Sequence, residues 1–160
     1  MDTIFSPWRY RYLATTRAEA GCVLCEKLAA GDDAANFILA RYRHVAVILN
    51  IFPYTNGHLM ILPIEHRAWL NEMEPAAREQ MMSIATRAED ALRREYTPDG
   101  LNLGVNFGQA AGAGIAGHLH MHVLPRWIGD ANFMSVIGET RVLPEDLART
   151  YERLKSYFAD

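Results

Sequence analysis

Apolar residues occur in short runs through the middle of the chain, a pattern typical of β-strands. The runs predict five strands, which cover residues 36–41, 44–49, 58–62, 101–107 and 118–124. A short polar break between the first two runs indicates a hairpin. The Asn56-Gly57 pair favours a turn before the third strand, because both residues tolerate positive φ, and Pro63 ends that strand.

Three other segments have a helical period. The longest covers residues 75–96 and begins with Pro75, which suits the first turn of a helix. Its expected buried stripe consists of Met81, Ile84, Ala85, Ala88 and Leu92. A short helix is expected over 22–30, ending at Gly31, and a C-terminal helix follows residues 144–146. The apolar residues of that last helix are Leu147, Tyr151, Leu154 and Phe158.

A strand-rich middle with segregated helices favours the α+β class with a mainly antiparallel sheet. The chain has 160 residues, which suits one compact domain. It contains no repeat, low-complexity tract or long linker, so we expect a single domain over 1–160. Residues 1–20 are rich in Arg and aromatic side chains without a clear period. We expect them to form an irregular arm that packs on the body or on a second subunit.

The bulk composition narrows the possible partners. Half of the residues are hydrophobic and 22% are charged, which are ordinary values for a soluble globular protein, and the net charge is -3. Without a basic surplus, a large nucleic acid is not an expected partner, although a small anion can still bind a locally positive site. We expect a cytoplasmic protein without a membrane partner, because the sequence has neither a signal-peptide pattern nor a spanning apolar run.

The histidine run His118-Leu-His120-Met-His122 is the strongest chemical signal. In a strand, alternate side chains share a face, so the three imidazoles would stand in a row about 7 Å apart. The residues between and after them, Leu119, Met121 and Val123, would occupy the other face. Imidazole is both a nucleophile and a group that ionises near neutral pH, so such a row can attack and bind a phosphate.

The residues alone leave other interpretations of this run open. The three side chains can simply lie on a solvated face of the sheet. They can also hold a catalytic metal, as a His-x-His strand does in cupin-type barrels and in some zinc enzymes, and the protein would then be a metal oxygenase on a cupin barrel. His58, which opens another expected strand, adds a fourth histidine to the candidate set.

The run matches the His-φ-His-φ-His-φ-φ signature of the histidine-triad (HIT) superfamily, and the resemblance extends over nearly the whole chain. Residues 56–63 resemble the Gly-His strand of that family, and residues 106–117 resemble its phosphate loop. The segment 118–133 is most similar to the branch of diadenosine tetraphosphate phosphorylases and fragile-histidine-triad hydrolases. The resemblance implies a HIT-like α+β fold, with an antiparallel sheet of about five strands, a long helix and a C-terminal helix. It also implies a homodimer.

The resemblance further implies a nucleotidyl transferase or hydrolase that acts on adenine dinucleoside polyphosphates. His120 would attack the α-phosphate and form a covalent nucleotidyl-histidine, which water or inorganic phosphate then releases. The implied binding residues are His122 and His58 for phosphate, Asn50 for the ribose hydroxyls, and Gly112 and Gly114 for a backbone anion nest. Alternatives are a nucleoside phosphoramidate or adenylyl-sulfate hydrolase, and a nucleotide-binding regulatory protein with little turnover.

The phosphate loop departs from the family pattern. Many members carry Ala-Gly-Gln shortly before the triad, whereas residues 110–117 here contain only Ala, Gly and Ile. Gln109 lies earlier in the loop. This departure points to backbone contacts with phosphate and leaves the acceptor, water or inorganic phosphate, open.

Cys22 and Cys25 form a Cys-x-x-Cys motif, which by itself suits a redox pair, half of a zinc site or two core residues. The resemblance implies a structural zinc site completed by His66 and His118. Four such ligands close a tetrahedral zinc and leave no catalytic position. His118 would then tie the catalytic strand to the N-terminal segment, rather than act as an acid or base.

Overall fold

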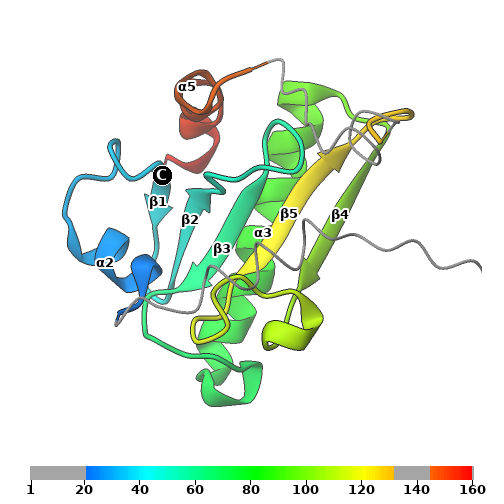
Figure 1. The fold of residues 1–160 in the computed structure, drawn as a ribbon. Helices are drawn as coiled ribbons and strands as arrows, with labels where there is room; N and C mark the ends of the chain where they lie inside the picture. Colours follow the sequence, from blue (N-terminus) through cyan, green and yellow to red (C-terminus); the bar gives the residue numbers. More distant parts are fainter. Residues whose placement is uncertain (1–20, 132–144, 160) are drawn as a thin grey trace, which may run out of the picture.

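A computed structural model describes residues 21–131 and 145–159 of the chain. Its centre is one five-stranded antiparallel sheet with the order β1-β2-β3-β5-β4 (Figure 1). The strands are β1 (Ile38–Arg41), β2 (Val45–Leu49), β3 (Leu59–Pro63), β4 (Gly100–Val105) and β5 (Met121–Arg126). The α+β fold expected from the sequence is therefore confirmed.

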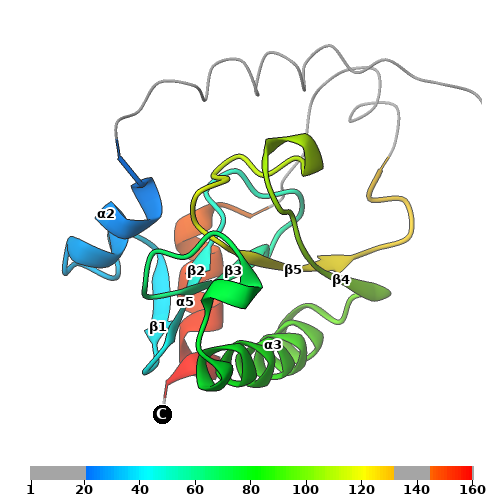
Figure 2. The same cartoon turned by 90° about the horizontal axis from the view of Figure 1, so that it is seen from below.

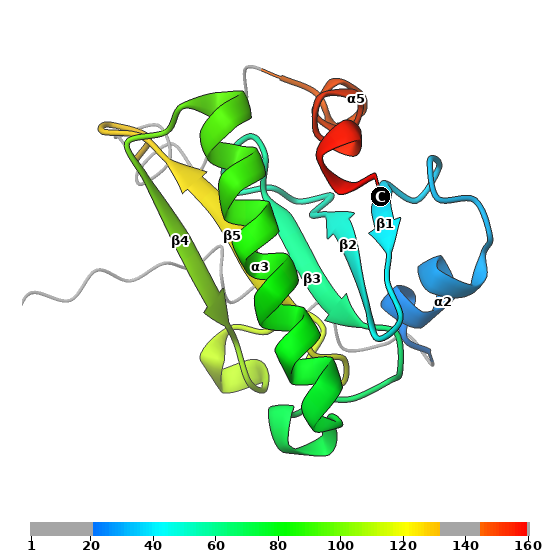
Figure 3. The same cartoon turned by 180° about the vertical axis from the view of Figure 1, so that it is seen from behind.

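The helices lie on both faces of this sheet. They are α2 (Val23–Ala29), α3 (Pro75–Tyr96) and α5 (Leu147–Phe158), with short 3₁₀ turns η1 (Leu70–Glu72) and η2 (Gln109–Ala111). Helix α3 crosses one face (Figure 3), while η2 and the loops around it lie on the other face (Figure 2). No helix in the described ranges, 21–131 and 145–159, has the length and apolar character needed to cross a membrane.

The main core fills the space between the sheet, α3 and α5. Residues Leu119, Met121 and Val123 are buried in it, as the alternation in the histidine run predicts. All five apolar residues expected on the buried stripe of α3 are buried as well. A smaller core on the opposite face joins Leu24 of α2 to Ile38, Ile48, Met60 and Leu62. The triad histidines are thus excluded from the main core and share the face of the sheet that α2 packs against.

The structure differs from the sequence expectation at the start of β5, which begins at Met121 and not at His118. Residues 118–120 instead pair with the chain that leaves β3. The N–H of Leu119 donates to the carbonyl of Arg67 (2.6 Å), and Nε2 of His118 donates to the carbonyl of Pro63 (2.9 Å). His118 and His120 therefore precede the strand, and the expected row of three histidines on one strand is wrong. The expected arm over residues 1–20 lies outside the described residues.

Candidate active site and metal centre

His120 lies immediately before β5 and is 5% exposed. Its Nδ1 is 2.8 Å from the carbonyl oxygen of His118. A carbonyl oxygen only accepts hydrogen bonds, so Nδ1 carries the proton and Nε2 carries the lone pair. Burial lowers the pKa of His120, which keeps the ring neutral at neutral pH. The backbone thus leaves Nε2 of His120 as the ring nitrogen with the lone pair.

His122 and His58 form a contact pair next to His120. Nε2 of His58 and Nδ1 of His122 are 2.9 Å apart, although the two residues are separated by 64 positions in the sequence. The sheet register places His122 opposite Met60, so His58 and His122 share a face. The rings of His120 and His122 lie edge to face with centroids 4.9 Å apart. Burial, together with the nearby His120, lowers the pKa of His122 to about 4.

The loop between β2 and β3 covers the histidine pair. The ring of Tyr54 lies 4.7 Å from that of His58 and 6.1 Å from that of His122, measured between centroids. The hydroxyl of Thr55 donates to the carbonyl of Pro125 (2.9 Å), which ties this loop to β5. Neither Tyr54 nor Thr55 was predicted from the sequence as a site residue. The only signal was their position in the turn that leads to His58.

Asn50 directly follows β2 and lies beside the same pair. Its Oδ1 accepts a hydrogen bond from the N–H of Phe52 (3.0 Å), and its Nδ2 lies 3.4 Å from Nδ1 of His58. The main-chain N–H of Asn50 donates to the carbonyl of His58 (3.0 Å). Asn50 therefore supports the loop, and its contact with ribose stays a prediction.

The Gly/Ala loop contains the two glycines expected to bind phosphate. Gly112 has a φ of 91° and its N–H already donates to the carbonyl of Gln109 (2.9 Å). The N–H of Gly114 has no acceptor among the residues that the structure describes, so Gly114 is the better placed donor of the two. Gly108, with a φ of 75°, opens the η2 turn.

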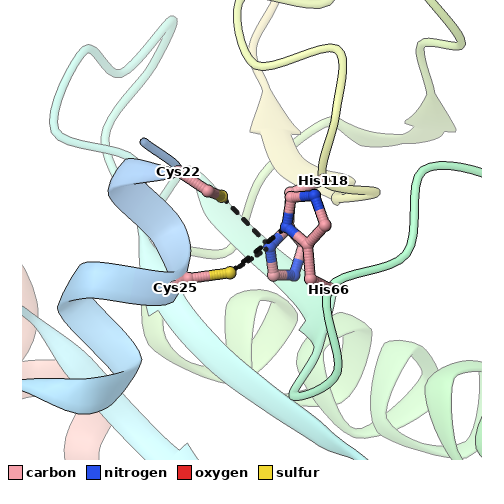
Figure 4. Close-up of side chains that lie close together, drawn as sticks. All are labelled: Cys22, Cys25, His66 and His118. Carbon is pink, nitrogen blue, oxygen red and sulfur yellow. Dashed lines mark hydrogen bonds between the residues drawn. The ribbon is translucent and has the colours of Figure 1, made fainter. Parts of the chain in front are cut away.

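Four metal-ligating side chains meet beside this site (Figure 4). Cys22, Cys25, His66 and His118 present one ligand atom each, and these atoms all lie within 4.8 Å of one another. Nδ1 of His118 is 3.3 Å from both sulfur atoms, and Nδ1 of His66 is 3.2 Å from that of Cys25. A tetrahedral zinc would separate sulfur and nitrogen ligands by about 3.5 Å, so the cluster is compatible with zinc.

Three separate parts of the fold supply this cluster. Cys22 and Cys25 come from the start of α2, His66 from the chain after β3, and His118 from the chain before β5. His118 is fully buried and donates through Nε2 to the carbonyl of Pro63. Its Nδ1 is therefore a lone pair directed at the two thiols, as a metal ligand requires.

Comparison with known proteins gives a consistent result. A family model described as "HIT domain" matches residues 32–127. The chain is 36% identical over 128 residues to a protein named AP-4-A phosphorylase from Mycobacterium tuberculosis, covering 80% of this chain and 66% of that relative. The chain thus spans slightly less than two thirds of that relative's length.

Solved structures agree with the sequence relatives. A structure described as a zinc-bound histidine triad family protein from Mycobacterium smegmatis superposes with a TM-score of 0.68 at 27% identity, over 86% of this chain and 92% of that one. A HIT family member from Bacillus subtilis, also 27% identical, gives 0.62 over 88% and 99% of the two chains. With its fold, its histidine cluster and these matches in agreement, the chain belongs to the HIT family.

Proposed function

We propose that this protein is a HIT-type nucleotidyl transferase or hydrolase acting on the α-phosphate of dinucleoside polyphosphates. The observation that carries the proposal is the hydrogen bond from Nδ1 of His120 to the carbonyl of His118. It leaves Nε2 of a buried, neutral imidazole as a lone pair beside a second imidazole, His122. The name of the M. tuberculosis relative supports an adenine dinucleotide substrate.

The proposed reaction has two displacements. Nε2 of His120 attacks the α-phosphorus, a P–N bond forms, and the P–O bond to the leaving polyphosphate breaks with its electron pair on oxygen. The imidazole then carries a positive charge, which the Nδ1–H bond to the carbonyl of His118 stabilises. Water or inorganic phosphate next attacks the same phosphorus, the P–N bond breaks, and His120 regains its lone pair.

The surrounding groups would hold the phosphate and the nucleoside. His122 and the N–H of Gly114 donate to the non-bridging oxygens, and Gly112 shapes the turn that presents the loop. Asn50, beside the histidine pair, binds the ribose hydroxyls. Inorganic phosphate is the proposed acceptor, since the loop lacks the glutamine of the hydrolase pattern and the relative is named a phosphorylase.

We also propose that Cys22, Cys25, His66 and His118 hold a structural zinc ion. The donor set and its spacing fit a closed tetrahedral site, and the M. smegmatis neighbour is described as zinc-bound. The ion would supply cross-linking and no open coordination position. Through His118 it would fix the carbonyl that orients His120.

We also propose a homodimer that forms through the outer edge of β4, which pairs with no strand among the residues that the structure describes. This strand ends the described sheet, and Leu103 on it is 49% exposed. An uncovered apolar edge strand is a pairing surface for another chain. Leu103→Lys should lower the mass measured by light scattering from dimer to monomer, and an unsubstituted protein that is already monomeric would contradict this proposal.

The catalytic proposal is tested with diadenosine tetraphosphate, with and without inorganic phosphate, by mass analysis of the products. ADP plus ATP formed only with phosphate supports the phosphorylase, whereas AMP plus ATP indicates hydrolysis. His120→Asn should lower kcat by about 10³-fold or more, because the nucleophile is removed. His44→Asn is the matched control, since His44 lies before β2 outside the site, and it should keep the activity.

Full activity in His120→Asn would refute the nucleophile. Turnover of a nucleoside phosphoramidate or of adenylyl sulfate, without turnover of the dinucleotide, would assign the alternative hydrolase. Tight nucleotide binding without any turnover would indicate a regulatory module.

A further inference from the structure

We propose that the main-chain N–H of Tyr54 sets the direction of a hydrogen-bond relay through His58 to His122, so that His122 is a neutral donor with its proton on Nε2. His58 is then a positioning residue that acts through His122 and does not itself contact phosphate. The relay is a property of the free protein. Only its last step, donation from His122 to a substrate phosphate, rests on the proposed function.

The direction of the relay is set by a main-chain N–H, which can donate a hydrogen bond but cannot accept one. The N–H of Tyr54 lies 3.1 Å from Nδ1 of His58, and a peptide N–H only donates. Nδ1 of His58 must therefore be the lone-pair nitrogen. In the neutral ring the proton is then on Nε2 of His58.

The amide of Asn50 adds a second donor at the same nitrogen. The N–H of Phe52 donates to Oδ1 of Asn50, which fixes the orientation of the amide. Nδ2 of Asn50 then faces Nδ1 of His58 at 3.4 Å. Two donors thus oppose a proton on Nδ1 of His58, and both come from the loop that leaves β2.

His58 continues the relay from the β2–β3 loop to His122 on the neighbouring strand β5. Its Nε2 lies 2.9 Å from Nδ1 of His122, so the Nε2–H donates and Nδ1 of His122 accepts. The remaining proton of a neutral His122 is on Nε2, the other side of the ring. Both nitrogens of His58 thereby face protein groups, which is why His58 acts behind His122.

The arrangement suits the chemistry of the site. His120 keeps a lone pair on its Nε2 because its Nδ1 donates to the carbonyl of His118. A neutral His122 supplies an N–H beside that lone pair without adding a buried cation. A cationic His122 would repel the positive charge that His120 gains on attack. The two adjacent rings therefore have opposite tautomers, one a nucleophile and the other a donor. Because the donor is fixed before substrate binds, no reorganisation is needed during the reaction.

Nitrogen-15 NMR of the histidine rings tests the relay in the full, unsubstituted chain. Couplings between ring carbon-bound protons and ring nitrogens distinguish a protonated nitrogen from a bare one. We expect Nε2–H for His58 and His122, and Nδ1–H for His120, at neutral pH. A proton on Nδ1 of His122, or a doubly protonated His122, overturns the proposal without any variant.

Two substitutions at one position separate hydrogen bonding from packing. In His58→Gln the side-chain amide can still donate where Nε2–H stood, whereas His58→Leu of similar size cannot. We expect His122 to remain Nε2–H in His58→Gln and to become a mixture of tautomers in His58→Leu. The value of kcat should fall by about tenfold in His58→Leu and recover in part in His58→Gln, with KM changed less. An unchanged His122 tautomer in His58→Leu overturns the relay.

The loop donor is tested with Tyr54→Pro, which removes the N–H, against Tyr54→Ala, which removes the ring and keeps the N–H. Only Tyr54→Pro should mix the tautomers of His58. A protein with the expected tautomers but no turnover of any nucleotide would refute the proposed function and leave the relay intact. Turnover with Nδ1–H on His122 would refute the relay alone.

Discussion

Gly57→Ala should destabilise the protein because of both backbone strain and a steric clash. Gly57 directly precedes His58 and has a φ of 75°, a region that L-residues with a Cβ rarely adopt. A Cβ at this position would lie 2.9 Å from Cε2 of Tyr96 and 3.0 Å from Cδ2 of Leu92. Both residues lie near the C-terminal end of α3, which packs against β3. The substitution thus acts at the point where the long helix supports the histidine site.

The expected magnitude follows from these two terms. The left-handed backbone conformation costs about 1 kcal/mol for alanine relative to glycine. Overpacking against the buried Leu92 and the half-buried Tyr96 adds about 1–3 kcal/mol. The total is about 2–4 kcal/mol, a large part of the stability of an ordinary domain.

Gly31→Ala is a matched control for the backbone term. Gly31 has nearly the same φ, 73°, but an added Cβ would meet nothing within 4 Å. It should therefore lose only about 1 kcal/mol in the free energy of unfolding, measured by urea denaturation at a fixed zinc concentration. If the two variants lose the same free energy, the steric argument at Gly57 is refuted.

Two further predictions concern the ionisable groups. The pKa of His122 falls from 6.5 to about 4 on folding, so the unfolded state binds more protons than the folded state between these pH values. His122 therefore contributes up to about 3 kcal/mol to the free energy of unfolding above pH 6.5. This contribution is lost as the pH falls to 4. Urea midpoints should drop more steeply over this range in the unsubstituted protein than in His122→Gln, and equal slopes would contradict the argument. Removal of the proposed zinc with a chelator should lower the melting temperature. Cys25→Ser should bind less zinc, and chelation should lower its melting temperature by less. A melting temperature that chelation leaves unchanged in zinc-loaded protein would argue against a structural zinc.

The parts of the fold that the sequence predicted best are those with a clear period. Helix α3 has the expected bounds, Pro75–Tyr96, because an apolar stripe, an N-terminal proline and a following Pro-Asp-Gly all agree. The start of β5 was wrong because alternation predicts which face a residue occupies but not its hydrogen-bond partner. The N–H of Leu119 pairs with Arg67, 52 positions away, and no local pattern encodes that contact.

The candidate site was predicted as a set of residues, but not as a geometry. The histidine run and its resemblance to the HIT family singled out His58, His120 and His122. Which ring nitrogen donates and which accepts depends on two main-chain groups, the carbonyl of His118 and the N–H of Tyr54. The sequence does not reveal where these groups point. The same holds for the metal cluster, where His118 meets Cys22 across 96 positions.

In the relay that we propose, main-chain contacts allow one site to hold two imidazoles of opposite tautomer with ring centroids 4.9 Å apart. His120 is fixed from the side of the Cys22, Cys25, His66 and His118 cluster. Nδ1 of His118 belongs to that cluster, the Nε2–H of His118 donates to the carbonyl of Pro63, and the carbonyl of His118 accepts from His120. His122 is fixed separately, by His58 on the same face of the sheet and by the β2–β3 loop. The two anchors share no residue. Loss of the zinc that we propose should therefore disturb the nucleophile while the donor keeps its tautomer, and Tyr54→Pro should do the reverse.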